Sequence, residues 1–269
     1  MRTLSNEVAA QAGKNITVCG WIHKKRLLGG LNFLNIRDRK GLVQVLVEKK
    51  DEVEKLRGLQ IGTVVCVKGS VVIDERAPGG AELHDASIEV IVPVEDAPPV
   101  EIDKPLDHKP DNLDTLFEYR PIGLRNLQET AILKIQSTVK DEVRKSLMSQ
   151  DFVEFNSPKL LPGATEGGAE VFKLDYFGKE ATLAQSAQFY KQIMVGVFER
   201  AFEINPTYRA ELSATTRHMT EFIHIDAEAG FVTFEELMAI MSKIVNDAVD
   251  AVWNKYEVEL KRWNATKPI

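Results

Sequence analysis

The chain has 269 residues, an apolar fraction of 44% and a formal net charge of −6. This length fits one large domain or two ordinary ones, and the acidic balance excludes a protein covered with basic charge for general nucleic-acid binding, although a local basic patch can still bind RNA. No apolar run is long enough for a membrane helix, and the first residues lack the apolar segment of a secretory signal. We therefore expect a cytoplasmic protein that makes no use of a membrane.

Residues 1–95 are predicted to form a five-stranded barrel. Runs of β-branched residues, separated by glycine-containing turns, predict strands at 16–22, 31–36, 42–47, 64–73 and 86–94. A short helix is expected at 51–59, and three strands, a helix and two strands is the order of an OB-fold. Cys19 and Cys66 lie in apolar runs and are expected to be reduced and buried, with a disulfide or a metal pair as the alternative.

Residues 96–121 are predicted to be a connector, because five prolines and many charges interrupt helices and central strands there. The pattern then changes to that of a second, α+β domain from residue 122 onward. Helical spacing of apolar residues predicts helices at 128–149, 184–200 and 233–253. Strands are expected at 152–155, 201–204 and 221–227. The predicted fold class is α+β, with an N-terminal barrel followed by an antiparallel sheet with flanking helices.

A basic and aromatic segment surrounds the Gly29-Gly30 turn of the predicted barrel. Its cations, opposed only by Asp38, are Lys24, Lys25, Arg26, Arg37, Arg39 and Lys40. Bases stack on aromatic rings while cations hold phosphates, so this composition suits single-stranded nucleic acid. Phe33 lies next to glycines, and Gln44 can both donate and accept hydrogen bonds, as the reading of a base edge requires. The alternative is that Phe33 belongs to the core and the charges form a solvated rim.

Two segments of the second domain carry groups that could bind a small polar molecule. Glu166 lies in a glycine-flanked loop and could bind an amine, although a plain turn is the simpler interpretation. Gln188 and Lys191 are three residues apart on an expected helix and share a face. A lysine there could bind a small carboxylate, and a solvated helix lysine is the alternative.

Residues 208–228 form the most specific segment. Arg209 and Glu211 would point to one face of an extended strand. The strand that follows the loop would present a face made of Phe222, His224, Asp226 and Glu228. Arginine binds phosphate oxygens through two parallel hydrogen bonds, and an aromatic ring can stack on a purine. A surface hairpin with ion pairs is the alternative, but it does not explain so many functional groups on one face.

Taken in order, these segments resemble class II aminoacyl-tRNA synthetases. Residues 208–222, with Tyr-Arg-Ala-Glu, a loop with Thr-Arg-His, and Thr-Glu-Phe, resemble motif 2, and residues 129–158 resemble motif 1. The order of OB-fold, linker and class II domain is that of the aspartyl, asparaginyl and lysyl subgroup. Residues 164–168 and 185–192 resemble aspartyl enzymes of the archaeal and eukaryotic type. Asparaginyl enzymes usually lack a lysine at the position of Lys191.

The resemblance implies an aspartate–tRNA ligase that uses ATP and Mg²⁺, and whose tRNA partner is tRNA(Asp), with tRNA(Asn) as a second candidate. The residues implied to hold the anticodon are Arg26, Phe33 and Gln44. Those implied to line the aspartate site are Glu166, Ser186, Gln188, Lys191 and Asp226. Those implied to bind ATP are Arg209, Glu211, Arg217, His218 and Phe222, and all of these except the phenylalanine would act in catalysis. A homodimer formed through motif 1 is also expected.

The resemblance implies further parts beyond Ile269. These are motif 3 with its ATP-binding arginine, the acidic ligands of Mg²⁺ and an arginine that helps Lys191 to select aspartate. Residues 122–269 are therefore expected to be a partial synthetase domain without metal ligands of its own, and Ala187 stands where the family usually has proline. A non-catalytic tRNA-binding relative and an asparaginyl enzyme remain as alternatives.

Overall fold

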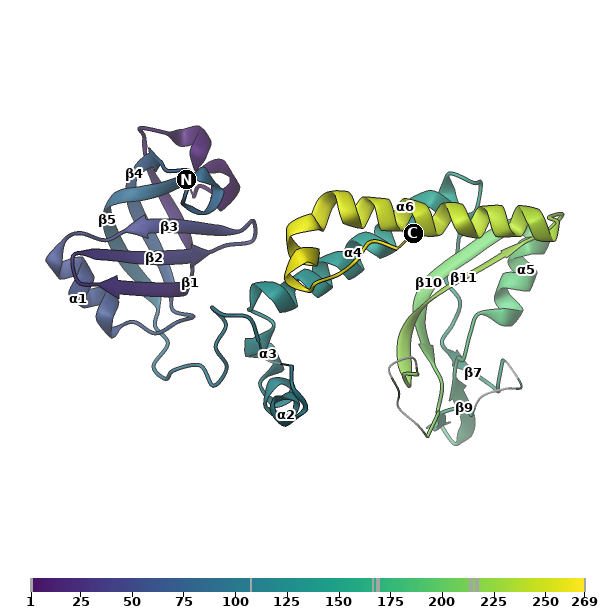
Figure 1. Cartoon of the computed structure of the whole chain (residues 1–269). Coiled ribbons are helices and arrows are strands. Elements are labelled where there is room, and N and C mark those ends of the chain that lie inside the picture. The colour runs from purple at the N-terminus through teal and green to yellow at the C-terminus, as the bar shows by residue number, and fades with distance from the viewer. Residues whose placement is uncertain are drawn as a thin grey trace. The chain divides into compact units, whose positions relative to one another are not determined.

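The structure is a computed structural model that describes residues 2–106, 108–165, 167, 170–212, 215 and 218–268. The chain divides into two compact units, Met1–Thr130 and Ala131–Ile269 (Figure 1). The first unit contains a closed barrel, and the second contains two small sheets with helices. None of the helices in the described ranges combines the length and the apolar composition that crossing a membrane requires.

The barrel of the first unit has the closed strand order β1-β2-β3-β5-β4. Its strands are β1 (Asn15–Leu28), β2 (Leu31–Arg37), β3 (Leu42–Leu46), β4 (Val64–Ile73) and β5 (Ala81–Val92), and helix α1 (Lys50–Gly58) lies between β3 and β4. Alternate residues of each strand point inward, so that Ile22, Leu34 and Leu83 are fully buried in one core. The predicted α+β class, with a five-stranded OB-type barrel at its start, is confirmed.

Two barrel strands are longer than predicted. β1 continues past residue 22 to Leu28, because β2 pairs with it as far as Leu31. β5 begins at Ala81 and not at residue 86, with Glu82 paired to Gln44 of β3. Both extensions are rich in charged residues, and a prediction that relies on runs of β-branched residues does not detect such strand segments.

Cys19 and Cys66 form a disulfide. The two residues are directly opposite in the antiparallel pair of β1 and β4, with their Cα atoms 4.0 Å apart, so their side chains meet on one face of the barrel wall. The expectation of two reduced cysteines is therefore wrong. The sequence showed that each cysteine lies in a strand, but the register that brings them together depends on residues far apart in the chain.

The carboxylate of Asp38 ties the N-terminal segment to the turn between β2 and β3. It accepts hydrogen bonds from Ser5 N and Ser5 Oγ, both at 2.7 Å, and from the N–H groups of Lys40 and Gly41, at 2.7 and 3.0 Å. Burial alone raises the pKa of Asp38, but the four hydrogen bonds outweigh it and hold the pKa below its usual value. Asp38 is thus a buried structural group and not an exposed charge opposing the basic segment.

We expect Asp38→Asn to destabilise the protein by about 1–3 kcal/mol at neutral pH, because buried donors lose a charged acceptor. A lowered folded-state pKa means that the carboxylate stabilises the fold above its unfolded pKa, about 3.9, and loses this contribution as the pH falls toward the folded pKa. In urea unfolding, the difference between wild type and variant should therefore shrink below about pH 4. A difference that stays constant down to about pH 3 would contradict this account.

The predicted connector contains two helices, α2 (Pro110–Glu118) and α3 (Arg120–Gly123). Pro110 and Pro121 stand at the first positions of these helices. Proline is well tolerated there, because the first N–H groups of a helix have no partner in the helix. These two prolines therefore begin helices, which the prediction of a connector did not include.

The second unit contains a three-stranded sheet of order β11-β10-β6 and a smaller sheet of order β7-β9-β8. The strands are β6 (Val153–Glu154), β7 (Leu160–Leu161), β8 (Lys173–Tyr176), β9 (Lys179–Leu183), β10 (Arg200–Tyr208) and β11 (Glu221–Ala229). The helices are α4 (Leu127–Met148), α5 (Gln188–Phe198) and α6 (Phe234–Arg262). The predicted helices and main strands are present, whereas the short strands of the smaller sheet were not predicted.

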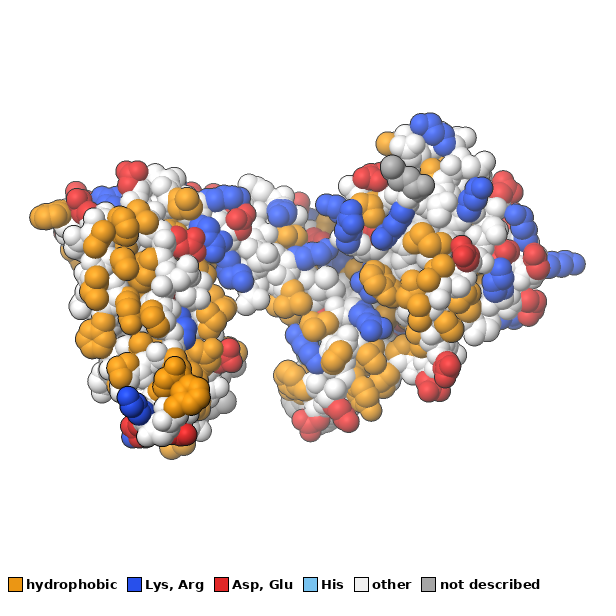
Figure 2. All heavy atoms as spheres, turned by 180° about the vertical axis from the view of Figure 1, so that it is seen from behind, with side chains coloured by type: hydrophobic (Ala, Val, Ile, Leu, Met, Phe, Trp, Pro, Cys, Tyr) orange, Lys and Arg blue, Asp and Glu red, His pale blue; other side chains and the backbone are white. Residues whose placement is uncertain are grey.

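The two faces of the β10–β11 sheet have different coverings. On one face, Phe202 packs with Leu147 of α4 and Ala248 of α6. On the other face, Ala201 packs with residues of α5. A cavity of about 730 Å³ lies on the first face, between α4, β11 and α6, and apolar side chains dominate its lining. Apolar side chains also cover much of the visible surface of this unit in the left half of Figure 2.

Candidate functional site

The face of the β10–β11 sheet that α5 covers collects the polar side chains of the second unit. Period-two alternation places four residues of β11 on this face, namely Phe222, His224, Asp226 and Glu228. Their cross-strand partners on β10 are Thr207, Asn205, Glu203 and Ala201. Because Ala187 and Tyr190 of the α5 region pack against this face, the start of α5 lies over the polar row.

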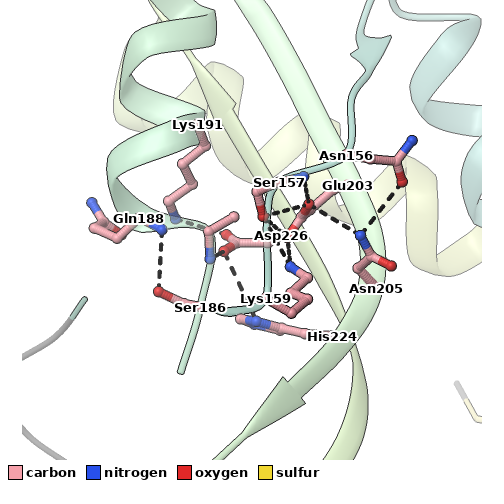
Figure 3. Close-up of polar contacts among 11 residues, drawn as sticks. Asn156, Ser157, Lys159, Ser186, Gln188, Lys191, Glu203, Asn205, His224 and Asp226 are labelled. Carbon is pink, nitrogen blue, oxygen red and sulfur yellow. Dashed lines mark hydrogen bonds and ion pairs between the residues drawn. The ribbon is translucent and has the colours of Figure 1, made fainter. Parts of the chain in front are cut away.

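Lys191 of α5 is the cation at the centre of this face. Its Nζ lies 2.7 Å from Asp226 Oδ1 and 3.3 Å from Glu228 Oε2, and only 13% of its side chain is exposed (Figure 3). Burial lowers the pKa of Lys191, but the hydrogen bonds and charges of the two carboxylates outweigh it, and the pKa lies above its usual value. Lys191 is therefore a fixed cation that could exchange one of its carboxylate partners for a ligand carboxylate.

Ala187, just before α5, contacts the same carboxylate, and its two neighbours are hydrogen-bonded to each other. Ala187 N donates to Asp226 Oδ2 at 3.4 Å, and Gln188 N donates to Ser186 Oγ at 3.2 Å. Ser186 and Ala187 are both buried. The structure thus brings Ser186, Gln188, Lys191 and Asp226 near one another (Figure 3), and their role in binding aspartate stays a prediction.

A row of ring contacts leads from Asp226 to Arg209. His224 Nδ1 lies 3.9 Å from Asp226 Oδ2, and the His224 ring meets the Phe222 ring edge-to-face at 5.8 Å. The Arg209 guanidinium lies 5.5 Å from the centroid of Phe222. Arg209 follows the end of β10, and its N–H still donates to Thr220 O at 3.0 Å, so the pairing with the β11 side continues. Arg209, Phe222 and Lys191 consequently lie along one sheet face.

The loop between β10 and β11 departs from the predicted geometry. β10 ends at Tyr208, and Glu211 N donates to Arg209 O in a tight turn, so Glu211 does not continue an extended strand with Arg209. His218 is exposed near the loop tip, where its Nδ1 lies 2.8 Å from Thr215 Oγ1. Arg217 and Glu166, which the resemblance also implied, lie outside the described residues.

A second lysine–carboxylate pair lies beside the first. Glu203, only 2% exposed, accepts hydrogen bonds from Ser157 N and Ser157 Oγ and forms an ion pair with Lys159. Glu203 is directly opposite Asp226 across the two strands, so two carboxylates with separate lysines are neighbours on one face (Figure 3). Sequence analysis did not single out Glu203, although the alternation of Glu203 with Asn205 could have indicated it.

The barrel brings together the three residues expected to hold an anticodon. The Arg26 guanidinium lies 5.0 Å from the Phe33 ring centroid, and Arg26 Nη2 donates to Gln44 Oε1 at 2.8 Å. Phe33 lies on the outer face of β2, between inward-pointing Asn32 and Leu34, and is therefore not part of the core. Two residues of β5 extend this group: Gln44 Nε2 donates to Glu82 Oε2 at 2.7 Å, and Glu82 Oε1 lies 2.8 Å from His84 Nε2.

Two family models match these two parts of the chain. The model of tRNA synthetases class II (D, K and N) matches residues 112–268, and that of the OB-fold nucleic acid binding domain matches residues 16–92. The chain belongs to the class II tRNA synthetases. The β10–β11 hairpin, whose sequence resembles motif 2, lies within the matched synthetase region, and the OB-fold carries the cluster of Arg26, Phe33 and Gln44.

Similar proteins include aminoacyl-tRNA ligases of two specificities. The aspartate–tRNA(Asp/Asn) ligase of Saccharolobus solfataricus is 40% identical over 257 residues, which are 95% of this chain and 59% of that enzyme. The ligase of the same name from Thermus thermophilus is 39% identical, covering 100% of this chain and 62% of that enzyme. The asparaginyl-tRNA synthetase from Pyrococcus horikoshii complexed with asparaginyl-adenylate has a TM-score of 0.87 and 33% identity, covering 100% and 64%. This synthetase chain therefore spans about three fifths of the length of its relatives.

One cation of the basic segment has a structural partner in this synthetase. Lys25 Nζ donates to the carbonyl oxygens of Leu56 and Arg57, at 3.2 and 3.4 Å, and to that of Leu59, at the end of α1. Burial lowers the pKa of Lys25. A lysine at the last carbonyls of a helix interacts favourably with the helix dipole, so Lys25 stabilises α1 and is not an exposed phosphate ligand.

Proposed function

We propose that the chain supplies the anticodon-binding domain and the aspartate- and ATP-binding motifs of an aspartate–tRNA ligase. Residues 1–95 would be the anticodon-binding domain, 96–121 the linker and 122–269 the partial catalytic domain. The observation that carries the proposal is the buried cation of Lys191, on the sheet face that also bears Phe222 and Arg209. A lysine suits a substrate carboxylate, and relatives at about 40% identity are named aspartate–tRNA(Asp/Asn) ligases.

In this reaction, a carboxylate oxygen of aspartate attacks the α-phosphorus of ATP. The new P–O bond forms aspartyl-adenylate, and the bond to pyrophosphate breaks. The aspartyl ester then passes to the terminal ribose of tRNA. The chain's own part is to hold the reactants in line and to neutralise charge at the phosphate, as expected for attack at phosphorus.

The sheet face offers a group for each part of these substrates. Lys191 would bind the side-chain carboxylate of aspartate, and Asp226 would attract its ammonium. Glu166, Ser186 and Gln188 would complete the aspartate site. Phe222 would stack on adenine, while Arg209 would hold the α-phosphate. Arg217 and His218 would meet the distal phosphates, with Glu211 near the adenine.

ATP would be used together with Mg²⁺, and the described residues do not by themselves make a site for that ion. Within the described ranges there is no group of three or more histidine, cysteine, aspartate or glutamate side chains that could hold a metal. Asp226 and Glu228 are the carboxylates of the sheet face nearest to Lys191, and both already form ion pairs with it. No step is therefore assigned to the ion.

Arg26, Phe33 and Gln44 would hold the anticodon of tRNA(Asp). The relatives are named ligases for tRNA(Asp/Asn), which supports tRNA(Asn) as a second partner. The residues of motif 1, in α4, β6 and Pro158, would form a homodimer interface. A cytoplasmic location would suit a translation enzyme, and the disulfide of Cys19 would then be of the kind found inside cells of hyperthermophiles.

Phe33→Ala should weaken the binding of tRNA(Asp) about 10- to 100-fold. Stacking of a base on an aromatic ring contributes about 1–3 kcal/mol, and Phe33 offers its ring on the outer face of the barrel. The measurement is filter binding at fixed salt. Phe117→Ala is the matched control, because Phe117 is 68% exposed on α2 of the same unit. Equal affinities of wild type and Phe33→Ala would remove Phe33 from the interface.

ATP–pyrophosphate exchange tests the ligase proposal. We expect exchange that depends on aspartate, measured with this chain alone and with a separately supplied C-terminal part of a relative. The absence of exchange in both arms, with tRNA binding intact, would instead identify a tRNA-binding module. Exchange driven by asparagine in place of aspartate would identify an asparaginyl enzyme, the candidate that the likeness to the Pyrococcus horikoshii structure favours.

A further inference from the structure

The outer face of β2 continues beyond Phe33 to a second ring and cation. Period-two alternation puts Phe33, Asn35 and Arg37 on this face. On β1, Arg26 pairs with Phe33 and Trp21 pairs with Arg37. The row that begins with the proposed anticodon residues therefore ends, about 13 Å further along the strand at the ordinary rise per residue, beside a tryptophan.

Close approach of the two strands fixes this end of the row. A Cβ atom on Gly20 would overlap the carbonyl oxygen of Arg37 and would lie 2.8 Å from Ile36 Cγ2. Only glycine allows β1 to pass so near to β2 at this point. Trp21, the next residue, is thereby held with its ring centroid 5.0 Å from the Arg37 guanidinium, while 38% of its surface remains exposed.

Arg37 and Arg125 are two cations at this end of the barrel without a carboxylate partner among the described residues. Arg125 Nη1 lies 3.8 Å from the position that a Cβ on Gly62 would take, and Gly62 N donates to the carbonyl oxygen of Ile22, the residue after Trp21. Arg37 Nε is buried and has no hydrogen-bond partner. Burial lowers the pKa of Arg37, and the positive charge of Arg125, which lies between α3 and α4, lowers it further. Across the described ranges, neither arginine forms a salt bridge. Two like charges left together in this way favour an anion between them.

We propose that Arg37 and Arg125 bind a backbone phosphate of tRNA beside the Trp21 ring. This inference rests on the proposed function, and it adds a contact that does not read a base. The guanidinium fork matches phosphate oxygens, and stacking on the tryptophan ring holds the plane of Arg37. An OB-fold contacts several nucleotides of one strand, so a bound strand with one base on Phe33 would bring a phosphate of a later nucleotide to this pair.

Arg125→Gln tests the proposal without disturbing the core, because Arg125 is exposed. We expect about a 3- to 10-fold loss of affinity for tRNA(Asp) at about 0.1 M salt. The slope of log K against log salt should become shallower by about 0.7–1, the value for one phosphate contact. The loss should be equal for a tRNA with a changed anticodon base, since phosphate contacts carry no sequence information.

Arg57→Gln is the matched control, because it removes the same charge from α1, where Arg57 is paired with Glu54 at 3.4 Å. It should leave the salt slope unchanged. Arg37→Gln should reproduce the effect of Arg125→Gln. Arg37→Gln also removes packing on Trp21, so circular dichroism and thermal unfolding are recorded for each variant. The result for Arg125→Gln decides the test, because Arg125 is exposed.

An unchanged affinity and salt slope in folded Arg125→Gln would overturn the inference. A loss confined to one anticodon sequence would also overturn it, because it would indicate contact with a base. If Phe33→Ala weakens tRNA binding and Arg125→Gln does not, the inference fails and the proposed function stands. If neither variant weakens binding, the proposed anticodon interface fails as well.

Discussion

Lys191→Met should weaken the binding of L-aspartate about 100- to 1000-fold. The substrate carboxylate would lose its cation, and Asp226 and Glu228 would lose the cation with which both now form ion pairs. Removal of one partner of a buried, hydrogen-bonded charge pair costs about 2–5 kcal/mol. Isothermal titration calorimetry with aspartate, and with a stable analogue of aspartyl-adenylate, measures the effect on this chain whether or not it turns over.

Lys243→Met provides the control for the loss of one lysine. Lys243 pairs with Asp247 on α6, but its side chain is half exposed, so little change in ligand affinity is expected.

The raised pKa of Lys191 adds a pH criterion. Because the folded-state pKa of Lys191 is raised, the side chain stays protonated at any pH below its unfolded pKa, about 10.4. It loses the proton only as the pH rises through the folded-state pKa. Aspartate affinity in wild type should therefore not fall from this cause between about pH 6 and pH 9. Folded Lys191→Met with wild-type affinity would exclude Lys191 from the aspartate site.

Glu203→Ala should reduce the free energy of unfolding by about 3–5 kcal/mol. The substitution leaves Lys159 and the buried Ser157 N–H and hydroxyl without their acceptor. Breaking a buried ion pair from one side is costly because the remaining charge is uncompensated. Urea unfolding followed by circular dichroism measures the loss, and a loss below about 1 kcal/mol would show that the pair is not buried in solution.

A double variant separates the charge from the packing. In Lys159→Met with Glu203→Leu, apolar groups of similar size replace both charges, and most of the stability should return. Because Glu203 is opposite Asp226 on the sheet face, aspartate affinity is measured on the same variant. A stability as low as that of Glu203→Ala would mean that backbone contacts at Ser157, and not the ion pair, account for the loss.

The arrangement of the candidate site on its sheet face was largely predictable because its pattern is local. Alternation along one strand put Phe222, His224 and Asp226 on one face, and the structure has this arrangement. Helical spacing likewise put Gln188 and Lys191 together near the start of α5. The turn at Glu211 was not predictable in this way, because a hydrogen bond within the loop ends the extended backbone that the alternation rule assumes.

Cross-strand partners were not predictable from local pattern. Gln44 was predicted to read a base edge, but Glu82, which fixes its amide, lies in a strand whose charged start looked like a loop. Glu203 was not predicted either, because its partners Ser157 and Lys159 lie 46 and 44 residues away in the chain. Such contacts follow from strand register, which no short segment encodes.

By itself, the amino-acid sequence determined the order of strands and helix along the barrel segment of the chain, the α+β class and the face of β11 that carries the candidate site. These features follow from periodicity and turn chemistry over a few neighbouring residues. Only the tertiary structure decided the disulfide of Cys19 and Cys66, the burial of Asp38 against Ser5 and the position of Arg125 beside Gly62 at the Trp21 end of the barrel. Each of these depends on segments far apart in the chain, which meet only when the barrel closes and fixes the register of its strands.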